Sequence, residues 1–169
     1  MRRANAAIGS SVFFIAAPMV VAGLIPWWLT RWDVRQPPLS IPFRVIGVAA
    51  IVVGVGVLLL AFVRFVLEGS GTPAPVAPTA HLVVGGLYRY VRNPMYLAVE
   101  AIILGQALVL GKLSLLWYGV IVMSAFVLFV RGYEEPALTR RFGASYETYR
   151  RAVPAWWPRR HPWVRDDAP

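Results

Sequence analysis

The sequence predicts an all-α, polytopic membrane protein, and its composition and its apolar runs support that prediction. Hydrophobic residues make up 58% of the 169 residues and charged residues only 15%, whereas soluble domains average about 45–50% and about 25%. The chain contains four apolar runs, and a helix needs roughly 20 apolar residues to cross a bilayer. One membrane-embedded domain over residues 1–169 is expected, with about four transmembrane helices at residues 8–29, 43–67, 95–111 and 113–130.

The first two runs predict membrane-spanning helices. The first run is too long for a signal-peptide core of roughly 7–15 residues, and it ends in Pro26-Trp27-Trp28, an aromatic cluster typical of a membrane interface. The second run contains Gly54 and Gly56, which predict close packing against another helix.

The third and fourth runs are separated only by residues 111–112, which predicts a tight antiparallel helical hairpin. Such a hairpin returns the end of the fourth helix to the start of the third. A group of polar side chains is therefore expected to meet at that end: Arg92, Asn93, Glu100, Glu134 and Glu135.

Basic residues set the expected orientation. With the N-terminus in the cytoplasm, thirteen of the 17 Lys and Arg residues fall on cytoplasmic segments, in agreement with the positive-inside rule. We therefore expect an integral protein of a bacterial inner membrane with both termini cytoplasmic. Residues 69–94 and 131–169 then form cytoplasmic segments that build a cofactor site. The second of them has helical apolar spacing interrupted at Gly143, which predicts two short interfacial helices.

The composition also excludes several functional classes. The basic residues behind the net charge of +9 flank apolar runs instead of forming a soluble basic face, so no nucleic-acid partner is expected. The sequence has no Cys, which excludes disulfides and thiolate chemistry, and its two His residues are too few for a histidine-rich metal site. It also has no dinucleotide-binding glycine motif, phosphate-binding loop or Gly-x-Ser-x-Gly motif.

The residues around the start of the third helix allow a structural and a functional interpretation. Asn93 and Pro94 suit its N-cap and first position, while Arg92 beside a helix N-terminus could bind an anion. Glu100 lies within the apolar helix, where an ionisable group should face the bundle or a wet cavity.

The acidic pair after the fourth run is similarly open to two interpretations. Glu134 and Glu135 could complement the dipole of a helix that starts there, and Glu135 could pair with Arg131 four residues earlier. Alternatively, both carboxylates belong to the polar site. From the residues alone, the prediction is a polar pocket that opens both to the cytosol and to lipid.

Two segments carry a resemblance to a known family. Residues 86–96 fit the pattern G-x-Y-x-x-x-R-[HN]-P-x-Y, and residues 134–154 fit E-E-x-x-L-x-x-x-F-G-x-x-Y-x-x-Y-x-x-x-V-P. In this order, on either side of a helical hairpin, they resemble the isoprenylcysteine carboxyl methyltransferase and phospholipid N-methyltransferase superfamily of integral membrane enzymes. Asn93 stands where many members have His, and Ala155 stands where Arg often follows Val-Pro.

The resemblance implies S-adenosylmethionine as the methyl donor. The acceptor would be a lipophilic small molecule or lipid that enters from the bilayer and presents a carboxylate, an amine or a thiol. Arg92 would stabilise a carboxylate acceptor, and Glu100 or Glu134 would serve as the base for an amine. No metal is expected. The residues implied to bind the donor are Tyr88, Arg92, Asn93, Pro94, Tyr96, Glu134, Glu135, Tyr146 and Tyr149.

Two other functions remain open at this point. An NADPH-dependent membrane enzyme similar to sterol reductases would have a comparable hairpin and C-terminal segment, and a non-catalytic membrane accessory protein would use the same residues only as caps and interfacial anchors. Cofactor preference distinguishes these alternatives.

Overall fold

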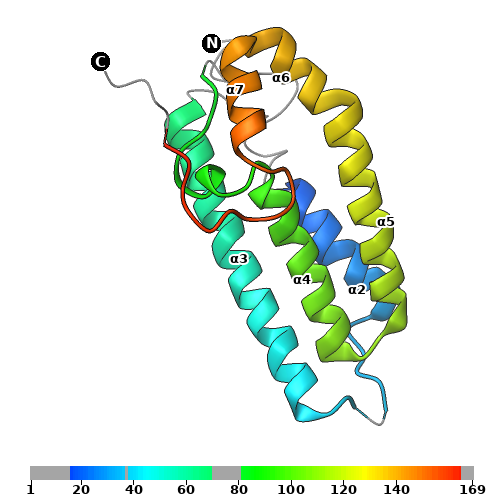
Figure 1. Cartoon of the computed structure of the whole chain (residues 1–169). Coiled ribbons are helices and arrows are strands. Elements are labelled where there is room, and N and C mark those ends of the chain that lie inside the picture. The colour runs from blue at the N-terminus through cyan, green and yellow to red at the C-terminus, as the bar shows by residue number, and fades with distance from the viewer. Residues whose placement is uncertain (1–15, 37, 70–80, 165–169) are drawn as a thin grey trace, which may run out of the picture.

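The computed structural model describes residues 16–36, 38–69 and 81–164. These residues form helices and irregular connections, and no β-strand occurs among them (Figure 1). The predicted all-α fold is confirmed. The helices, in chain order, are the first helix (Ala16–Thr30), which contains a π-helical turn at Val20–Leu24 and ends as α2 (Ile25–Thr30), then α3 (Ile41–Gly69), α4 (Pro94–Leu110), α5 (Leu113–Phe129), α6 (Glu135–Phe142) and α7 (Ala144–Ala152).

The long helices have lipid-facing surfaces. Two helical segments are long and apolar enough to cross a membrane, Ile41–Arg64 and Leu113–Phe142, while the first helix and α4 are apolar but shorter. Large side chains on the long helices stay exposed, for example Val52 at 65% and Trp117 at 64%. Extended apolar faces of this kind require contact with lipid. The chain is thus an all-α membrane protein, and the predicted span over residues 8–29 begins outside the described residues.

Glycines allow α3 and α4 to pack side by side (Figure 1). A Cβ added to Gly47 would lie 2.7 Å from the carbonyl oxygen of Gly105, and one added to Gly54 would lie 2.9 Å from that of Ala98. The backbones therefore approach as closely as small residues permit. The packing role predicted for Gly54 is confirmed. The same prediction for Gly56 was wrong, because a Cβ there would meet nothing within 4 Å.

The predicted hairpin of α4 and α5 is confirmed. Gly111 adopts a left-handed conformation with φ of +68°, and its N–H donates to the carbonyl oxygen of Ala107 at 2.8 Å. This conformation, which glycine adopts without steric cost, ends α4. Lys112 then leads directly into α5, so the end of α5 returns to the level at which α4 starts.

The structure corrects the prediction for the segment after α5. The helix does not end near residue 130 but continues through a π-helical turn at Val130–Glu134 into α6, so that Leu113–Phe142 is one helix. Pro136 explains the turn: it has no N–H for the carbonyl four residues earlier, and its ring crowds that carbonyl. The interpretation of Glu134 and Glu135 as residues at a helix start was therefore wrong, because both lie within a continuous helix.

The remaining C-terminal elements gather at one end of the bundle. The predicted break at Gly143 is confirmed, with φ of +52°, and it turns the chain from α6 into α7. Figure 1 shows α6, α7 and the segment after α7 on the same end as the loop that precedes α4. Segments that are far apart in the sequence therefore meet there.

Candidate functional site

The loop before α4 is anchored by buried tyrosines. It contains a short 3-10 turn, Gly86–Arg89, within which Tyr88 is buried. The hydroxyl of Tyr149 in α7 donates to the carbonyl oxygen of Tyr88 at 2.7 Å. Burial raises the pKa of the Tyr149 phenol, so that this hydroxyl keeps its proton and remains a donor. Tyr88 and Tyr149 thus tie α7 to the loop.

The segment after α7 closes over the same loop. The N–H of Arg92 donates to the carbonyl oxygen of Pro154 at 3.0 Å, and the N–H groups of Arg159 and Trp163 donate to the carbonyls of Tyr90 and Arg89, both at 2.9 Å. The Arg89 Nε returns a bond of 2.6 Å to the carbonyl oxygen of Trp163. These bonds hold residues 154–163 along the loop. The sequence does not predict these contacts, because an irregular segment rich in Pro and Trp has no periodicity that assigns it a partner.

Asn93 occupies the predicted N-cap position of α4, but its side chain does not cap the helix. Pro94 begins α4 as predicted, but the Asn93 side chain makes no capping hydrogen bond. Its Nδ2 instead donates to the carbonyl oxygen of Ala155 at 3.2 Å. The amide is therefore used to attach the C-terminal segment, and the prediction that Asn93 caps the helix through its side chain was wrong.

Arg92 lies at the centre of a charged network. Its Nη1 donates to Oε1 of Glu135 at 2.8 Å and to the hydroxyl of Tyr146 at 3.0 Å. Only 12% of the Arg92 side chain and 13% of the Glu135 side chain are exposed. The second Glu135 oxygen lies 3.6 Å from Nε of Arg150. Glu135 therefore pairs with two arginines that are distant in sequence, and the predicted approach of Glu135 to Arg92 is confirmed.

One atom of this network has no assigned partner. The Nε of Arg92 is buried and makes no hydrogen bond within the described part of the chain. Tyr146 beside it is 2% exposed. Burial raises the pKa of its phenol, and the positive charge of Arg92 opposes that rise. A neutral Tyr146 hydroxyl therefore lies beside the Arg92 guanidinium group, whose Nε still has a hydrogen to donate, in a mostly buried environment.

The second carboxylate contacts an aromatic cluster. The hydroxyl of Tyr96 donates to Oε1 of Glu134 at 2.5 Å. The Tyr96 ring lies 4.5 Å from the ring of Phe126 in α5 and 6.4 Å from the ring of Trp156 in the C-terminal segment, measured between centroids. Aromatic faces together with a carboxylate form an environment suited to a cation. Phe126 and Trp156 were not predicted as site residues.

Glu100 lies deeper in the hairpin. It follows Tyr96 by four residues and faces α5, where a Cβ added to Gly119 would lie 2.7 Å from its Oε1. Its Oε2 is buried without a hydrogen-bond partner among the described residues. At 1.5 Å per residue, Glu100 is about 9 Å along the helix from the start of α4. The sequence predicted that Glu100 lies near Glu134 and Glu135. In the structure, its side chain lies against Gly119 of α5.

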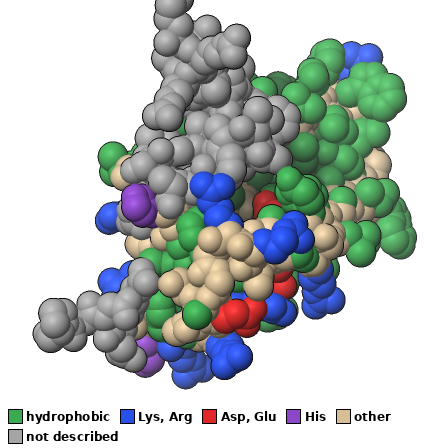
Figure 2. All heavy atoms as spheres, turned by 90° about the horizontal axis from the view of Figure 1, so that it is seen from above, with side chains coloured by type: hydrophobic (Ala, Val, Ile, Leu, Met, Phe, Trp, Pro, Cys, Tyr) green, Lys and Arg blue, Asp and Glu red, His purple; other side chains and the backbone are tan. Residues whose placement is uncertain are grey.

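Charge is distributed unevenly over the end of the molecule that carries this site. Figure 2 shows Lys and Arg side chains around acidic ones on that end. Most of these basic side chains are exposed, among them Arg140, Arg141, Arg151 and Arg160. Glu135 itself lies between Arg92 and Arg150. An excess of positive charge at this end favours the approach of anionic groups.

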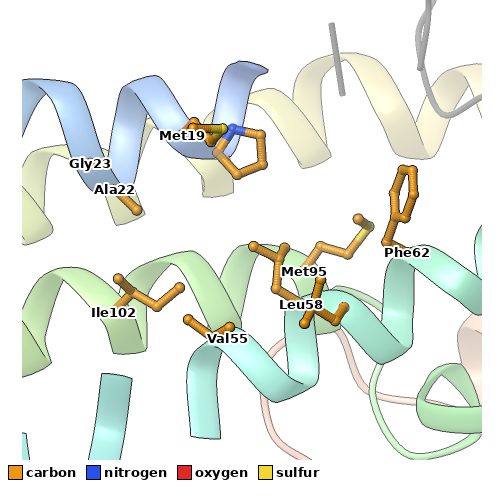
Figure 3. Close-up of a pocket in the computed structure, with 10 residues that line it drawn as sticks. Met19, Ala22, Gly23, Val55, Leu58, Phe62, Met95 and Ile102 are labelled. Atoms are coloured by element: carbon orange, nitrogen blue, oxygen red, sulfur yellow. The ribbon is translucent and has the colours of Figure 1, made fainter. Parts of the chain in front are cut away.

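An apolar cavity of about 450 Å³ adjoins the site (Figure 3). Its volume falls within the range of about 300–1,000 Å³ that is usual for small-molecule pockets. Met95 lines the cavity, and the next residue, Tyr96, belongs to the polar site. The cavity is lined by side chains of three helices, including Met19 and Ala22 of the first helix, Leu58 and Phe62 of α3, and Met95 and Ile102 of α4.

Comparisons with known proteins agree with this arrangement. The model of the phospholipid methyltransferase family matches residues 43–145, which include α3, the α4–α5 hairpin and α6. The chain is 37% identical over 78 residues to the Protein-S-isoprenylcysteine O-methyltransferase of Schizosaccharomyces pombe, over 46% of this chain and 33% of that protein. The chain thus spans about a third of the length of this curated relative, and no solved structure matches it. Since the family model matches more than half of the chain, the chain belongs to the phospholipid methyltransferase family.

Proposed function

We propose that this protein transfers a methyl group from S-adenosylmethionine to a lipophilic acceptor that reaches it from the bilayer. The observation that carries the proposal is that two carboxylate contacts, Arg92–Glu135 and Tyr96–Glu134, lie next to an apolar cavity. A polar place for the donor then adjoins an apolar place for the acceptor. Family membership supports the reaction class.

The residues of the polar site fit the donor chemically. The buried, unpartnered Nε of Arg92 is a donor for a carboxylate. Glu134 and Glu135 can accept hydrogen bonds from an ammonium group or from ribose hydroxyls. The rings of Tyr96 and Trp156 can face a positive sulfur. We propose that Tyr88, Asn93, Pro94, Tyr146 and Tyr149 support this set by holding the loop, α7 and the C-terminal segment together.

S-adenosylmethionine supplies a methyl group that is already activated by the positive charge on its sulfur. The protein therefore has to orient the acceptor and exclude water. The C-terminal segment lies over the loop before α4 through the Arg159 and Trp163 hydrogen bonds and would exclude water from that side. Arg92 would stabilise an acidic acceptor, while Glu134 beside Tyr96, or Glu100 deeper in the hairpin, would take the proton of an amine.

We also propose that the end of the bundle with α6 and α7 faces the cytoplasm, which places both termini on that side. Basic residues support this orientation by the positive-inside rule. The opposite end carries four of the described basic residues, Arg31, Arg35, Arg44 and Lys112. The end with α6 and α7 carries ten: Arg64, Arg89, Arg92, Arg131, Arg140, Arg141, Arg150, Arg151, Arg159 and Arg160.

The proposal is tested by calorimetric titration of the detergent-purified protein with S-adenosylhomocysteine, the product form of the donor. Saturable binding is expected, with no binding of NADPH. Binding of NADPH alone would instead favour a reductase. If neither ligand binds, with phospholipid and S-farnesylcysteine also present, the protein is a non-catalytic accessory protein and the proposal is wrong.

A variant at Glu134 locates the site. Glu134→Gln keeps the shape of the side chain but removes the charge that accepts from Tyr96. Because a hydrogen bond to a charged group is worth about 1.5–3 kcal/mol, the affinity for S-adenosylhomocysteine should fall at least about tenfold. Glu147→Gln is the matched control, since Glu147 pairs only at the surface with Arg150 at 3.7 Å. Equal affinities in the two variants would remove Glu134 from the donor site.

A further inference from the structure

A proline in the first helix leaves two carbonyl groups without backbone donors. Pro26 follows the π-helical turn, in which the N–H of Ile25 donates to the carbonyl of Val20, five residues earlier. The Val21 carbonyl thereby loses Ile25 as its donor. The Ala22 carbonyl would need the N–H of residue 26, which proline lacks. Two adjacent carbonyls in an apolar helix therefore need partners from elsewhere.

Two polar side chains of the α4–α5 hairpin supply these partners. The Nε2 of Gln106 in α4 donates to the Ala22 carbonyl oxygen at 2.7 Å, and the hydroxyl of Tyr118 in α5 donates to the Val21 carbonyl oxygen at 2.8 Å. Each unsatisfied backbone group in the hydrocarbon region costs several kcal/mol. These contacts account for a Gln in the apolar helix α4, and they attach the first helix to both helices of the hairpin.

The same contacts adjoin the wall of the apolar cavity. Ala22 lines the cavity from the first helix, and Ile102 lines it from α4. Gln106 Nε2 reaches the backbone carbonyls of both residues, at 2.7 Å for Ala22 and at 3.3 Å for Ile102. Figure 3 shows Ala22 and Ile102 facing one another across the space between their helices. One amide group therefore sets the separation of two cavity walls.

We propose that Gln106 and Tyr118 are positioning residues that hold the first helix as a wall of the cavity and thereby set its affinity for the hydrocarbon chain of the methyl acceptor. This inference rests on the proposed function. The assignment of a hydrocarbon chain as the occupant rests on the wholly apolar lining and on Met95, which lines the cavity and directly precedes Tyr96 in the first turn of α4. Among the described residues, Gln106 and Tyr118 donate hydrogen bonds to the first helix and not to Arg92, Glu134 or Glu135, so donor binding should not depend on them. The kinetic test uses Gln106, since Tyr118 lies near Glu100.

A thermal double-mutant cycle tests the attachment itself. Gln106→Leu should lower the melting temperature by about 2–4 °C for each kcal/mol lost, because the Ala22 carbonyl loses its partner. Pro26→Ala supplies a backbone N–H for that carbonyl, so Gln106→Leu should cost less than half as much in the Pro26→Ala background. Equal costs in both backgrounds would overturn the attachment. Tyr118→Phe should also lower the melting temperature, because the Val21 carbonyl loses its partner. Ser124→Ala is the control, since the Ser124 hydroxyl donates to Val120 of its own helix.

Methyl-transfer kinetics test the positioning role. The reaction is followed with labelled S-adenosylmethionine and either S-farnesylcysteine or phosphatidylethanolamine vesicles, whichever the wild-type protein methylates. Gln106→Leu should raise the KM for the acceptor by at least about fivefold, a loss within the range of one hydrogen bond, with kcat within about twofold. Adding Pro26→Ala should restore the KM, and S-adenosylhomocysteine affinity should not change.

Failure of the positioning role can be distinguished from failure of the proposed function. An unchanged acceptor KM in Gln106→Leu, with methylation intact, would overturn the positioning role and leave the proposed function in place. If the wild-type protein methylates neither acceptor and binds no S-adenosylhomocysteine, the proposed function and the role assigned to the cavity both fail, whereas the thermal cycle still decides whether Gln106 attaches the first helix.

Discussion

At the scale of single residues, Arg92 connects more parts of the site than any other residue described above. Its Nη1 joins Glu135 and Tyr146, and its backbone N–H joins Pro154. The loop before α4, α6, α7 and the C-terminal segment therefore meet around one residue. A ligand carboxylate at its free Nε would join a network that is already in place, and little ordering would remain to oppose binding.

Replacing Arg92 should affect stability and donor binding separately. Arg92→Ala leaves the mostly buried Glu135 carboxylate with only Arg150 at 3.6 Å, and loss of one partner of a buried ion pair costs about 3–5 kcal/mol. We expect a lower melting temperature, with a loss of stability near the lower part of that range because Arg150 remains. We also expect the affinity for S-adenosylhomocysteine to fall at least about tenfold.

A second substitution tests whether Arg92 stabilises the protein by neutralising Glu135. Glu135→Gln added to Arg92→Ala removes the unpaired charge, so the double variant should melt at a higher temperature than Arg92→Ala alone, while donor binding stays weak. If the double variant is less stable than Arg92→Ala, Arg92 does not act by neutralising Glu135. Thermal melting and calorimetry on the same preparations separate the two effects.

Single residues also show what the sequence could predict. The hairpin argument correctly placed Glu135 beside Arg92, because an antiparallel pair joined by two residues fixes which ends meet. It could not assign Asn93, whose side chain has two possible uses: the helix cap that local pattern favours, and the Ala155 carbonyl that it actually contacts. That carbonyl lies 62 residues away in an irregular segment, and no periodicity in the sequence brings the two together.

At the scale of helices and turns, a proline after a π-helical turn occurs twice, with different consequences. Pro26 and Pro136 each follow a π-helical turn, and proline was the only signal for either turn in the sequence. In the first helix, the half-buried side chains of Gln106 and Tyr118 satisfy the freed carbonyls. After α5, the turn carries exposed residues, including Arg131 and Gly132, so water can donate hydrogen bonds to the freed carbonyls there. The sequence predicted α3, α4 and α5 to within a few residues but not these turns, because proline more often ends a helix than widens it.

The contact between α3 and α4 provides a matched pair of substitutions. Gly54→Ala would place its Cβ 2.9 Å from the backbone oxygen of Ala98, so the helices must separate, whereas Gly56→Ala would meet nothing within 4 Å. We expect Gly54→Ala to lower the melting temperature. We expect Gly56→Ala to leave it unchanged or to raise it slightly, because Ala is favoured over Gly within a helix by about 0.5–1 kcal/mol.

The comparison is informative because both variants add one methyl group to the same helix, two residues apart. If both variants behave alike, close contact through Gly54 does not hold α3 against α4. Loss of stability in Gly56→Ala alone would indicate that a second copy of the chain packs on the Gly56 face.

At the scale of the whole molecule, the site consists of parts that no single segment provides. The loop before α4, the π-helical turn after α5, α7 and the C-terminal segment all lie on one end of the bundle (Figure 1). The apolar cavity lies between helices that carry lipid-facing side chains. Under the proposed function and orientation, a polar donor would bind at the membrane surface and an apolar acceptor would bind within the bilayer.

That orientation can be tested directly because the chain has no Cys. Single cysteines introduced at the exposed positions Gln36 and Arg160 lie on opposite ends of the bundle. In intact bacterial cells that express the protein, a membrane-impermeant maleimide should label Gln36→Cys and should label Arg160→Cys only after the cells are opened. The opposite pattern would place the donor site outside the cell, away from cytoplasmic S-adenosylmethionine, and would contradict the proposed function together with the orientation. Labelling of both positions in intact cells would point to two orientations of the chain, in which case the positive charge at the end with α6 and α7 is not sufficient to set the topology.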